Sequence, residues 1–498
     1  EHTLYFTLGL ISLCCKRASL LLFALVLLLT AECLRARRPR SFPPGPRAFP
    51  LVGNMFSLDP GDLSEKYGKV YSLKMGPSWT VVLNGLSALQ EGLTKGDHLN
   101  DRPEFPIHSD FSHFINRLFY THCIIFSNGH MWKQQRRFAL FTLKYFGVGK
   151  KSLEFSILDE FMYISKEIAN HKGKPFNPHL IMNNAVSNII CSLVFGHRFE
   201  YGNENVELLY LYLSIHSPFN LYNAFPVLMR RLPGPHHALQ NIYGEIMDLI
   251  KTEVNQHKED WNPSEPRDFI DCYLNEIQKD KRDDEADAGF NEDNLVMCGF
   301  DLFGAGSHTT SVTLRWALLY MTKYPEVQAK VQAEIDEVVG TSRQPSMEDR
   351  ADLPYTDAVI HEIQRMGNIV PLSLPHVTTR DIRLGGYKIP KGVTIIPNLT
   401  SVLFDKNEWE TPDAFNPGHF LNPEGKFVKR AAFIPFSAGK RVCLGENLAR
   451  MELFLFFTSF MQRFSFSTPP GVEPVLKPRF GVTLSPPPFE ICATPRKE

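Results

Sequence analysis

The sequence predicts a mainly α-helical protein with small β-sheets, built as one large domain behind a short N-terminal segment of different character. Asn291–Thr322 and Leu444–Phe464 are apolar on most faces, which indicates long buried helices. Lys69–Lys74 and Thr80–Leu83 alternate and are rich in β-branched residues, which is typical of short strands. Helical patterning dominates from about residue 130 to residue 340, so the expected sheets flank a helical centre.

The N-terminal segment predicts a membrane anchor. Ala18–Ala31 is an apolar run broken only by Ser19 and Thr30. A helix of that length covers about 21 Å of a bilayer core of roughly 30 Å, so a span also needs the flank to Leu34 and snorkelling side chains. Arginines follow at positions 35, 37, 38 and 40, which places the next part of the chain in the cytosol. A cleaved signal peptide is the alternative, opposed by these arginines and by the unpaired pattern of the cysteines.

Pro43–Pro46 follows the basic segment and predicts a semi-rigid spacer. No Gly/Ser linker, charge block or repeat divides the rest of the 498 residues. We therefore expect residues 1–42 to form an anchor with a basic stop segment, and residues 43–498 to form a single domain.

The second half of the chain predicts further helices and strands. Tyr324–Gly340 is amphipathic, with Pro325 near its start and a glycine at its end. Ser346–Met366 ends in another helix, and strand-like, turn-rich segments occupy residues 369–400 and the tail after 475.

Composition excludes several classes of protein. A net charge of −1 argues against a general nucleic-acid binder, which would carry a basic excess. The nine cysteines form no CxxC pairs, so neither a disulfide framework nor a zinc site is indicated. Phenylalanine is abundant, at 38 residues, which fits a large apolar core and pocket or core packing alone.

The most informative segment is a cysteine loop. Phe436, Gly439, Arg441, Cys443 and Gly445 occur at fixed spacing just before the apolar helix of 444–464. Glycines allow a tight turn and close approach of backbone N–H groups to sulfur, and helix-start amides with Arg441 favour a thiolate. Such a thiolate suits axial binding of one metal ion, whereas a buried structural cysteine is the alternative.

This loop resembles the cysteine-loop signature of the cytochrome P450 family, Phe-x-x-Gly-x-Arg-x-Cys-x-Gly, at every position. The resemblance covers nearly the whole chain after residue 43 and is closest to vertebrate microsomal family 2, especially subfamily J. Asn183–Cys191, Leu232–His236 and Thr313–Tyr320 carry the closer match. The resemblance implies the cytochrome P450 fold, with a long central helix over a haem b and a C-terminal loop in which Cys443 ligates the iron.

The resemblance also implies contacts to the haem. Trp132 and Arg136 stand four residues apart on one helix face and would donate to the propionates, as would His376 and Arg441. Without the cysteine loop, a buried tryptophan and a solvated arginine would explain Trp132 and Arg136 equally well.

Glu362 and Arg365 are spaced to pair on one helix face, which by itself is a common surface ion pair. In the family this Glu-x-x-Arg pair is locked to an arginine of a later Phe-x-Pro-x-Arg-Phe segment. His419 stands at that position here, and a neutral imidazole is a weaker third partner than a guanidinium. We expect these residues to support the cysteine loop structurally.

Residues 305–310, Ala-Gly-Ser-His-Thr-Thr, match the family's oxygen-handling segment except at His308, where an acid is usual. Ala305 and Gly306 would leave room for dioxygen, and Thr309 and His308 would handle protons. The alternative is that His308 only packs or forms a hydrogen bond. By resemblance, substrate would contact Phe300, Ala305, Leu372 and Val482, although core packing explains Phe300 and Val482 equally well. Segments 53–67 and 201–222 are shorter than in close relatives.

The expected function is that of a haem-thiolate monooxygenase of the endoplasmic reticulum membrane, with its catalytic domain in the cytosol. It would act on lipophilic substrates, which the resemblance suggests are polyunsaturated fatty acids or xenobiotics. No Gly-x-Gly-x-x-Gly fingerprint for a dinucleotide occurs at a strand–helix turn, so NADPH–cytochrome P450 reductase would supply electrons, with cytochrome b5 as a further candidate partner.

A basic face for that partner is expected from Lys133, Arg137, Lys440 and the pair Lys429–Arg430, although a solvated charged face is the alternative. Two other functions stay open at this point. One is a haem-thiolate isomerase or peroxide-using enzyme that needs no reductase, and the other is a non-catalytic haem-binding protein.

Overall fold

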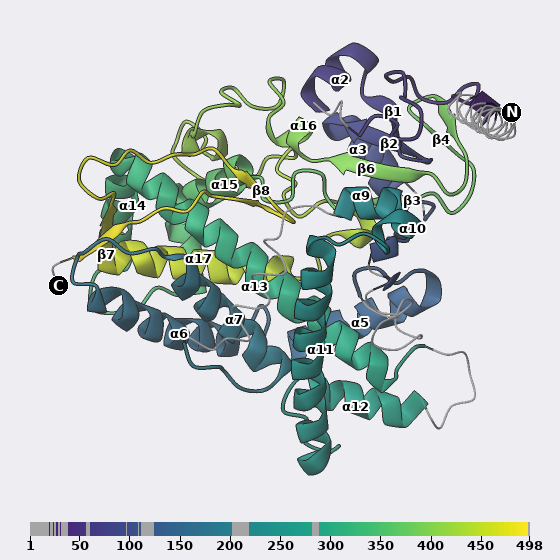
Figure 1. The fold of residues 1–498 in the computed structure, drawn as a ribbon. Helices are drawn as coiled ribbons and strands as arrows, with labels where there is room; N and C mark the ends of the chain where they lie inside the picture. Colours follow the sequence, from purple (N-terminus) through teal and green to yellow (C-terminus); the bar gives the residue numbers. More distant parts are fainter. Residues whose placement is uncertain are drawn as a thin grey trace, which may run out of the picture.

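The computed structural model describes residues 38–55, 60–95, 97–107, 109–110, 124–201, 219–280 and 288–496, and the single residues 19, 23, 26, 27 and 30. Helices fill most of this part of the chain, and a small sheet lies at one end (Figure 1). The described α-helices are α2 (Pro60–Tyr67), α3 (Gly85–Thr94), α5 (Gly129–Tyr145), α6 (Lys151–Asn170), α7 (His179–Val194), α9 (Phe219–Ala224), α10 (Pro226–Met229), α11 (Pro235–Asp260), α12 (Phe269–Asp280), α13 (Glu292–Lys323), α14 (Pro325–Val338), α15 (Pro354–Gly367), α16 (Thr400–Leu403) and α17 (Glu446–Arg463).

The described strands form four small sheets. Their order is β1-β2-β6-β3 in the largest sheet, in which β2 and β6 are parallel and the other pairs antiparallel. The remaining sheets are two-stranded hairpins or pairs. The strands are β1 (Val70–Met75), β2 (Ser78–Asn84), β3 (His376–Val377), β4 (Ile382–Leu384), β5 (Tyr387–Ile389), β6 (Thr394–Asn398), β7 (Phe464–Ser467), β8 (Arg479–Phe480), β9 (Leu484–Ser485) and β10 (Cys492–Pro495).

Helix α13 runs through the middle of the molecule (Figure 1) and confirms the long helix predicted at Asn291–Thr322. It begins where the Asn291 side chain accepts a hydrogen bond from the Asn294 N–H, with acidic residues in the first turn. It packs against α7, α11, α15 and α17, so it is buried on almost every side as its apolar pattern predicts.

The other predicted elements are confirmed, with small shifts of their ends. Helix α14 occupies the middle of Tyr324–Gly340, and α17 occupies Leu444–Phe464. The segment Ser346–Met366 divides into a 3-10 helix, Met347–Asp352, and α15 because Pro354 starts a new helix. The mainly helical fold class with small sheets is therefore confirmed.

The proline-rich segment is docked onto the sheet. Ser72 of β1 donates from its hydroxyl to the Pro43 carbonyl and from its backbone N–H to the Pro44 carbonyl, both at 2.7 Å. A Cβ at Gly45 would lie 1.9 Å from the Ser72 carbonyl oxygen, so only glycine fits there. Phe42, just before this segment, is 6% exposed and packs on Trp79.

Most of the expected anchor lies outside the described residues. Among the residues that are described, no helix is both long and apolar enough to cross a membrane. The two segments expected to be shorter than in relatives are described in part, since residues 56–59 and 202–218 fall outside the described ranges.

Candidate active site

The cysteine loop has the tight geometry that its glycines predict. Gly439 has φ +77°, and a Cβ there would lie 2.0 Å from the Leu93 carbonyl oxygen of α3. The Cys443 N–H donates to the Phe436 carbonyl at 3.0 Å, which closes the loop, and Gly445 is the N-cap of α17. The side chain of Cys443 is exposed, although the helix that follows it is buried.

The surroundings of Cys443 act on its thiol in opposite directions. Protein atoms crowd the loop even though the side chain has accessible surface, and this desolvation is the largest effect, raising the pKa of the Cys443 thiol. A hydrogen bond from Gly445 and the charge of Arg136 oppose the rise, whereas Glu446 adds to it. A bound cation would reverse the balance, because metal ligation deprotonates a thiol outright.

Arg441 binds backbone carbonyls beside the loop. Its guanidinium donates to the carbonyls of Asn100, Ile125 and Ser127 and lies 3.9 Å from the centre of the Trp132 ring. It therefore ties the loop to the segment before α5. The cation that lowers the pKa of the Cys443 thiol is Arg136, whereas the sequence analysis expected Arg441 to favour the thiolate.

Buried and half-buried donors lie beside the loop. Trp132 is 3% exposed, and its Nε1 has no hydrogen-bond partner among the described residues. Arg136 donates to the Val442 carbonyl at 2.6 Å. His376 in β3 bonds through Nδ1 to the Leu99 carbonyl, and burial lowers the pKa of His376 to about 3, so the ring is neutral.

Arg102 belongs to the same group, and sequence reasoning missed it. It is 6% exposed and donates from Nη1 to the carbonyls of Leu374 and Pro375, both at 2.9 Å. Burial and the nearby charge of Arg136 lower the pKa of Arg102 to about 10. The only signal for it in the sequence is an arginine before a proline, which is too common to single out.

These donors form a cationic site. Within the described part of the chain, neither Arg102 nor Arg136 forms a salt bridge with a carboxylate. Buried guanidinium groups need anionic partners to offset their desolvation. Together with the bare Trp132 Nε1, they suit a ligand that carries carboxylate groups.

Helix α13 carries two of the residues that the sequence analysis expected at the active site. Ala305 is exposed and Thr309 half-buried, whereas most of the helix is buried. The Thr309 hydroxyl donates to the Ala305 carbonyl at 2.8 Å, one turn back. Gly306 does not share this role, because a Cβ there would lie 2.9 Å from Cγ1 of Ile190 on α7. Gly306 therefore allows α13 and α7 to pack closely, whereas the sequence analysis had expected it to leave room for dioxygen.

His308 lies on the buried side of α13. Its Nε2 forms a hydrogen bond of 2.9 Å with the Thr483 hydroxyl in the turn between β8 and β9. Burial, with a smaller effect from Arg315, lowers the pKa of His308 to about 3, so the imidazole is neutral at physiological pH. This hydrogen bond agrees with the alternative in the sequence analysis, in which His308 only packs or forms a hydrogen bond.

The expected substrate contacts lie on α13, on the segment after α15 and on the turn between β8 and β9. Hydrogen bonds join these segments, beginning with the one from Thr483 to His308 of α13. The Leu484 N–H donates to the Ile369 carbonyl at 2.9 Å, and the Ser373 hydroxyl donates to Ser437 at 3.2 Å in the cysteine loop. Leu372 and Val482, on these segments, are 40% and 48% exposed. Phe300, five residues before the exposed Ala305 on α13, packs edge-on against Tyr243 of α11.

Comparison with known proteins agrees with this arrangement. The family model for "Cytochrome P450" matches residues 43–493. Human cytochrome P450 2J2 is 46% identical over 492 residues, which cover 96% of each chain. Rat (Rattus norvegicus) cytochrome P450 2D3 is 44% identical over 500 residues, covering 95% of this chain and 97% of the relative. Cytochrome P450 2K1 of Oncorhynchus mykiss is 45% identical over 492 residues, covering 95% and 96%.

The chain belongs to the cytochrome P450 family. It is most similar to family 2, with subfamily J among its strongest matches, as the sequence motifs predict. It is accordingly a cytochrome P450 monooxygenase whose cofactor is haem b.

The described residues of this cytochrome P450 fit haem b. Cys443 offers an accessible sulfur, which suits ligation of the iron, and Ala305 of α13 is exposed. Arg102, Arg136 and the Trp132 Nε1 are the donors that would hold the propionates. Phe436 and Gly439 shape the loop around the sulfur.

The cytochrome P450 also contains the expected buried triad. Arg365 makes two hydrogen bonds to the Glu362 carboxylate, at 2.7 and 2.8 Å, and three more to the carbonyls of residues 403, 412 and 414. His419 Nδ1 lies 3.2 Å from the same carboxylate. The Thr411 N–H donates to His419 Nε2, so the proton must be on Nδ1, which donates to Glu362. The triad is fully buried and joins α15 to the segment before the cysteine loop.

Proposed function

We propose that this cytochrome P450 is a microsomal monooxygenase that inserts one atom of dioxygen into lipophilic substrates with electrons from NADPH–cytochrome P450 reductase. Cytochrome b5 is the second proposed electron donor. The observation that supports this is the tight cysteine loop with its accessible Cys443 thiol, in a chain whose α13 carries the exposed Ala305 and the half-buried Thr309. Haem b, when bound, supplies the redox chemistry that activates dioxygen.

The protein's own residues would hold the haem in place and pass protons to the active site. Cys443 would ligate the iron and donate electron density, which the Gly445 N–H tunes. Arg102, Arg136 and Trp132 would hold the propionates, with His376 and Arg441 bracing the segments that carry them. The Thr309 hydroxyl would pass protons toward the dioxygen side, and His308, as a neutral ring, can only relay a proton and add no negative charge.

Lipophilic substrates are proposed because the exposed side chains near this site are apolar. Ala305, Leu372 and Val482 belong to segments that hydrogen bonds bring together around α13. Fatty acids with several double bonds and xenobiotics are the proposed classes. Phe300 is proposed to contact substrate through its exposed part, since its ring also packs on Tyr243.

The proposed location is the endoplasmic reticulum membrane, with residues 1–42 as the anchor and residues 43–498 as the cytosolic catalytic domain. Exposed apolar side chains near the N-terminal sheet support additional contact with lipid. They are Phe49, Leu51, Leu221, Val227 and Leu228, exposed between 44% and 62%.

The proposed docking face for the reductase rests on α5. Lys133 and Arg137 are exposed there and form no salt bridge with a described carboxylate, so they can meet an acidic partner, although Lys133 also lies in the field of Asp97. Lys440 forms an ion pair with Asp97, and Arg430 pairs with Glu410 and stacks on Trp409. These two cations are partly neutralised, so Lys133 and Arg137 should contribute more to docking.

The test is turnover of a labelled fatty acid and of a lipophilic drug by the full-length protein, with and without reductase. The proposal expects oxygenated product that requires both NADPH and reductase. Rearranged product without reductase, or oxygenation that needs only peroxide, would establish the isomerase or peroxide-using alternative. Haem loading with no product under any condition would establish a haem-binding protein without turnover.

A further inference from the structure

An ion pair lies in the first turns of α17, directly after the cysteine loop. Glu446 is the first residue of this helix and follows Cys443 by three positions. Arg450, one turn further, donates from Nε to the Glu446 Oε1 at 3.0 Å, and its Nη2 lies 2.9 Å from the same oxygen. The Arg450 and Glu446 side chains are 25% and 32% exposed, so salt screens them less than a pair on the open surface. The mechanism described so far gives this pair no role.

Arg450 also contacts the cysteine loop itself. Its guanidinium lies 5.1 Å from the centre of the ring of Phe436, whose carbonyl accepts the N–H of Cys443. Its Nη1 lies 3.3 Å from Nε2 of His361, a residue of α15 that is 5% exposed. A guanidinium can only donate, so Nε2 accepts and the ring proton is on Nδ1, which donates to the Asp357 carbonyl at 2.7 Å. His361 is therefore an uncharged brace that fixes the position of the Arg450 charge.

The charge of Glu446 acts on the sulfur. Burial is the main cause of the raised pKa of the Cys443 thiol, and among the charged side chains Glu446 raises this pKa whereas Arg136 lowers it. A negative charge that disfavours a thiolate also disfavours an added electron on a metal bound to that thiolate, because both changes make the same site more negative. Groups around a metal site set its reduction potential in this way. An unpaired Glu446 would therefore lower the potential, and the cation of Arg450 opposes this effect.

We propose that Glu446 and Arg450 tune the reduction potential of the haem bound at Cys443. Glu446 supplies a negative charge near the sulfur, and Arg450 is a positioning residue that holds Glu446 and offsets its charge. One electron reduces the ferric haem, and no bond forms or breaks at either side chain. The pair lets the haem accept this electron more readily than it would beside an uncompensated acid. The inference rests on ligation of the iron by Cys443, and it requires no particular substrate or electron donor.

The test is a reductive titration of the haem-loaded full-length protein with dithionite and mediator dyes, without reductase or substrate. Glu446→Gln removes the negative charge and should raise the potential, whereas Arg450→Gln leaves Glu446 uncompensated and should lower it. Each change should alter the ratio of reduced to oxidised haem at a fixed potential by about 3- to 10-fold. A 10-fold change corresponds to about 59 mV for a one-electron couple. The double variant Glu446→Gln/Arg450→Gln should return close to the wild-type potential.

The opposite signs separate tuning from a purely structural contact. If the pair only held α17 in place, both single variants would shift the potential in the same direction or leave it unchanged. Arg450→Lys keeps the charge in a less rigid geometry and should stay nearer to the wild type than Arg450→Gln. Arg463→Gln removes an exposed arginine at the other end of α17, so it is the matched control and should leave the potential unchanged.

The outcomes distinguish this proposal from the ones on which it depends. Shifts of the same sign in both single variants, or no shift in either, would overturn the tuning role. Should Arg450→Gln fail to take up haem, Glu446→Gln still tests the proposal, and an unchanged potential in that variant would overturn it. A wild type without the thiolate-type Soret band of the reduced carbon monoxide complex would instead contradict ligation by Cys443. An absence of reductase-dependent product would contradict only the proposed function, because the potential is measured without turnover.

Discussion

At the scale of single residues, the proposed haem site depends on the sulfur of Cys443 as the iron ligand. Replacing Cys443 with Ala should abolish the thiolate-type Soret band of the reduced carbon monoxide complex, because no other described cysteine lies in the loop. Cys272→Ala changes a half-buried cysteine of α12 and should leave the band intact. Persistence of the band in Cys443→Ala would exclude Cys443 as the ligand.

The buried cations beside the loop should hold the haem. Arg102→Leu, Arg136→Ala and Trp132→Phe should each speed haem loss by about 10- to 100-fold, since a hydrogen bond to a charged group contributes roughly 1.5–3 kcal/mol. Transfer of haem to an apo-globin acceptor measures this rate. Arg137→Ala removes an exposed arginine next to Arg136 and should have little effect. If Arg102→Leu released haem no faster than Arg137→Ala, Arg102 would have no role in haem binding.

His308 and Thr309 should affect coupling in opposite ways. His308→Glu should raise product per NADPH, because it places next to Thr309 the carboxyl group that is usual in the family. Thr309→Ala should lower product per NADPH. Because the pKa of His308 is lowered to about 3, the imidazole stays neutral from pH 6 to 8, so His308→Ala should keep the wild-type pH profile. Equal coupling in wild type, His308→Glu and His308→Ala would remove His308 from the proton pathway.

At the scale of elements, the triad of Glu362, Arg365 and His419 joins α15 to the chain that enters the cysteine loop. Glu362→Gln leaves the Arg365 charge buried without its carboxylate and should cost about 3–5 kcal/mol of stability. The measurement is chemical unfolding of the haem-loaded protein. Glu276→Gln, which breaks a solvent-exposed pair with Lys279, should cost less than about 1 kcal/mol. Similar costs for both variants would contradict the structural role of the triad.

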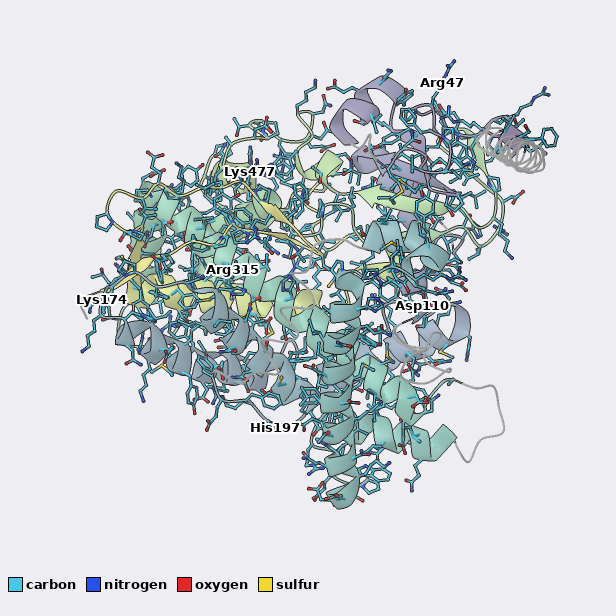
Figure 2. All side chains as sticks on the ribbon, viewed as in Figure 1. Arg47, Asp110, Lys174, His197, Arg315 and Lys477 are labelled. Atoms are coloured by element: carbon cyan, nitrogen blue, oxygen red, sulfur yellow. The ribbon has the colours of Figure 1, made fainter. Side chains whose placement is uncertain are left out.

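A second element-scale contact ties the segment before residue 111 to α9 and α10. Asp110 accepts two hydrogen bonds of 2.6 Å from Arg230 and one of 2.7 Å from Tyr222, at the side of the molecule that carries these helices (Figure 2). Asp110→Asn should speed hydrogen exchange in residues 221–230, because the ion pair is lost. Arg231→Gln, at an exposed neighbouring position, serves as control. Unchanged exchange in Asp110→Asn would show that the contact does not hold α9 and α10.

At the scale of the whole molecule, the boundary between anchor and body can be tested. Removal of the N-terminal segment should leave a haem-loaded body that binds membranes more weakly, with residual attachment through exposed apolar side chains. A chain that starts at Arg38 keeps Phe42 in the core, whereas one that starts at Pro43 loses it. Burying a phenylalanine contributes about 1.5–3 kcal/mol, so the shorter chain should melt at a lower temperature. Failure of both chains to take up haem would contradict the proposed division.

The sequence alone determined the fold class, the long helices and the position of the cysteine loop. These features depend on periodicity and on short motifs, in which neighbours along the chain carry the signal. The pairing of Glu362 with Arg365 was also predictable, because three residues bring two side chains together on one helix face.

Only the tertiary structure decided which distant groups meet. Arg102 reaches the site because the segment around Asp101 bridges to Val377, beside His376 in β3. Gly306 faces Ile190 of α7, and the Arg441 guanidinium turns toward carbonyls before α5 instead of toward the sulfur. Burial and contact across the chain are properties of the packed molecule, so no local pattern could reveal them.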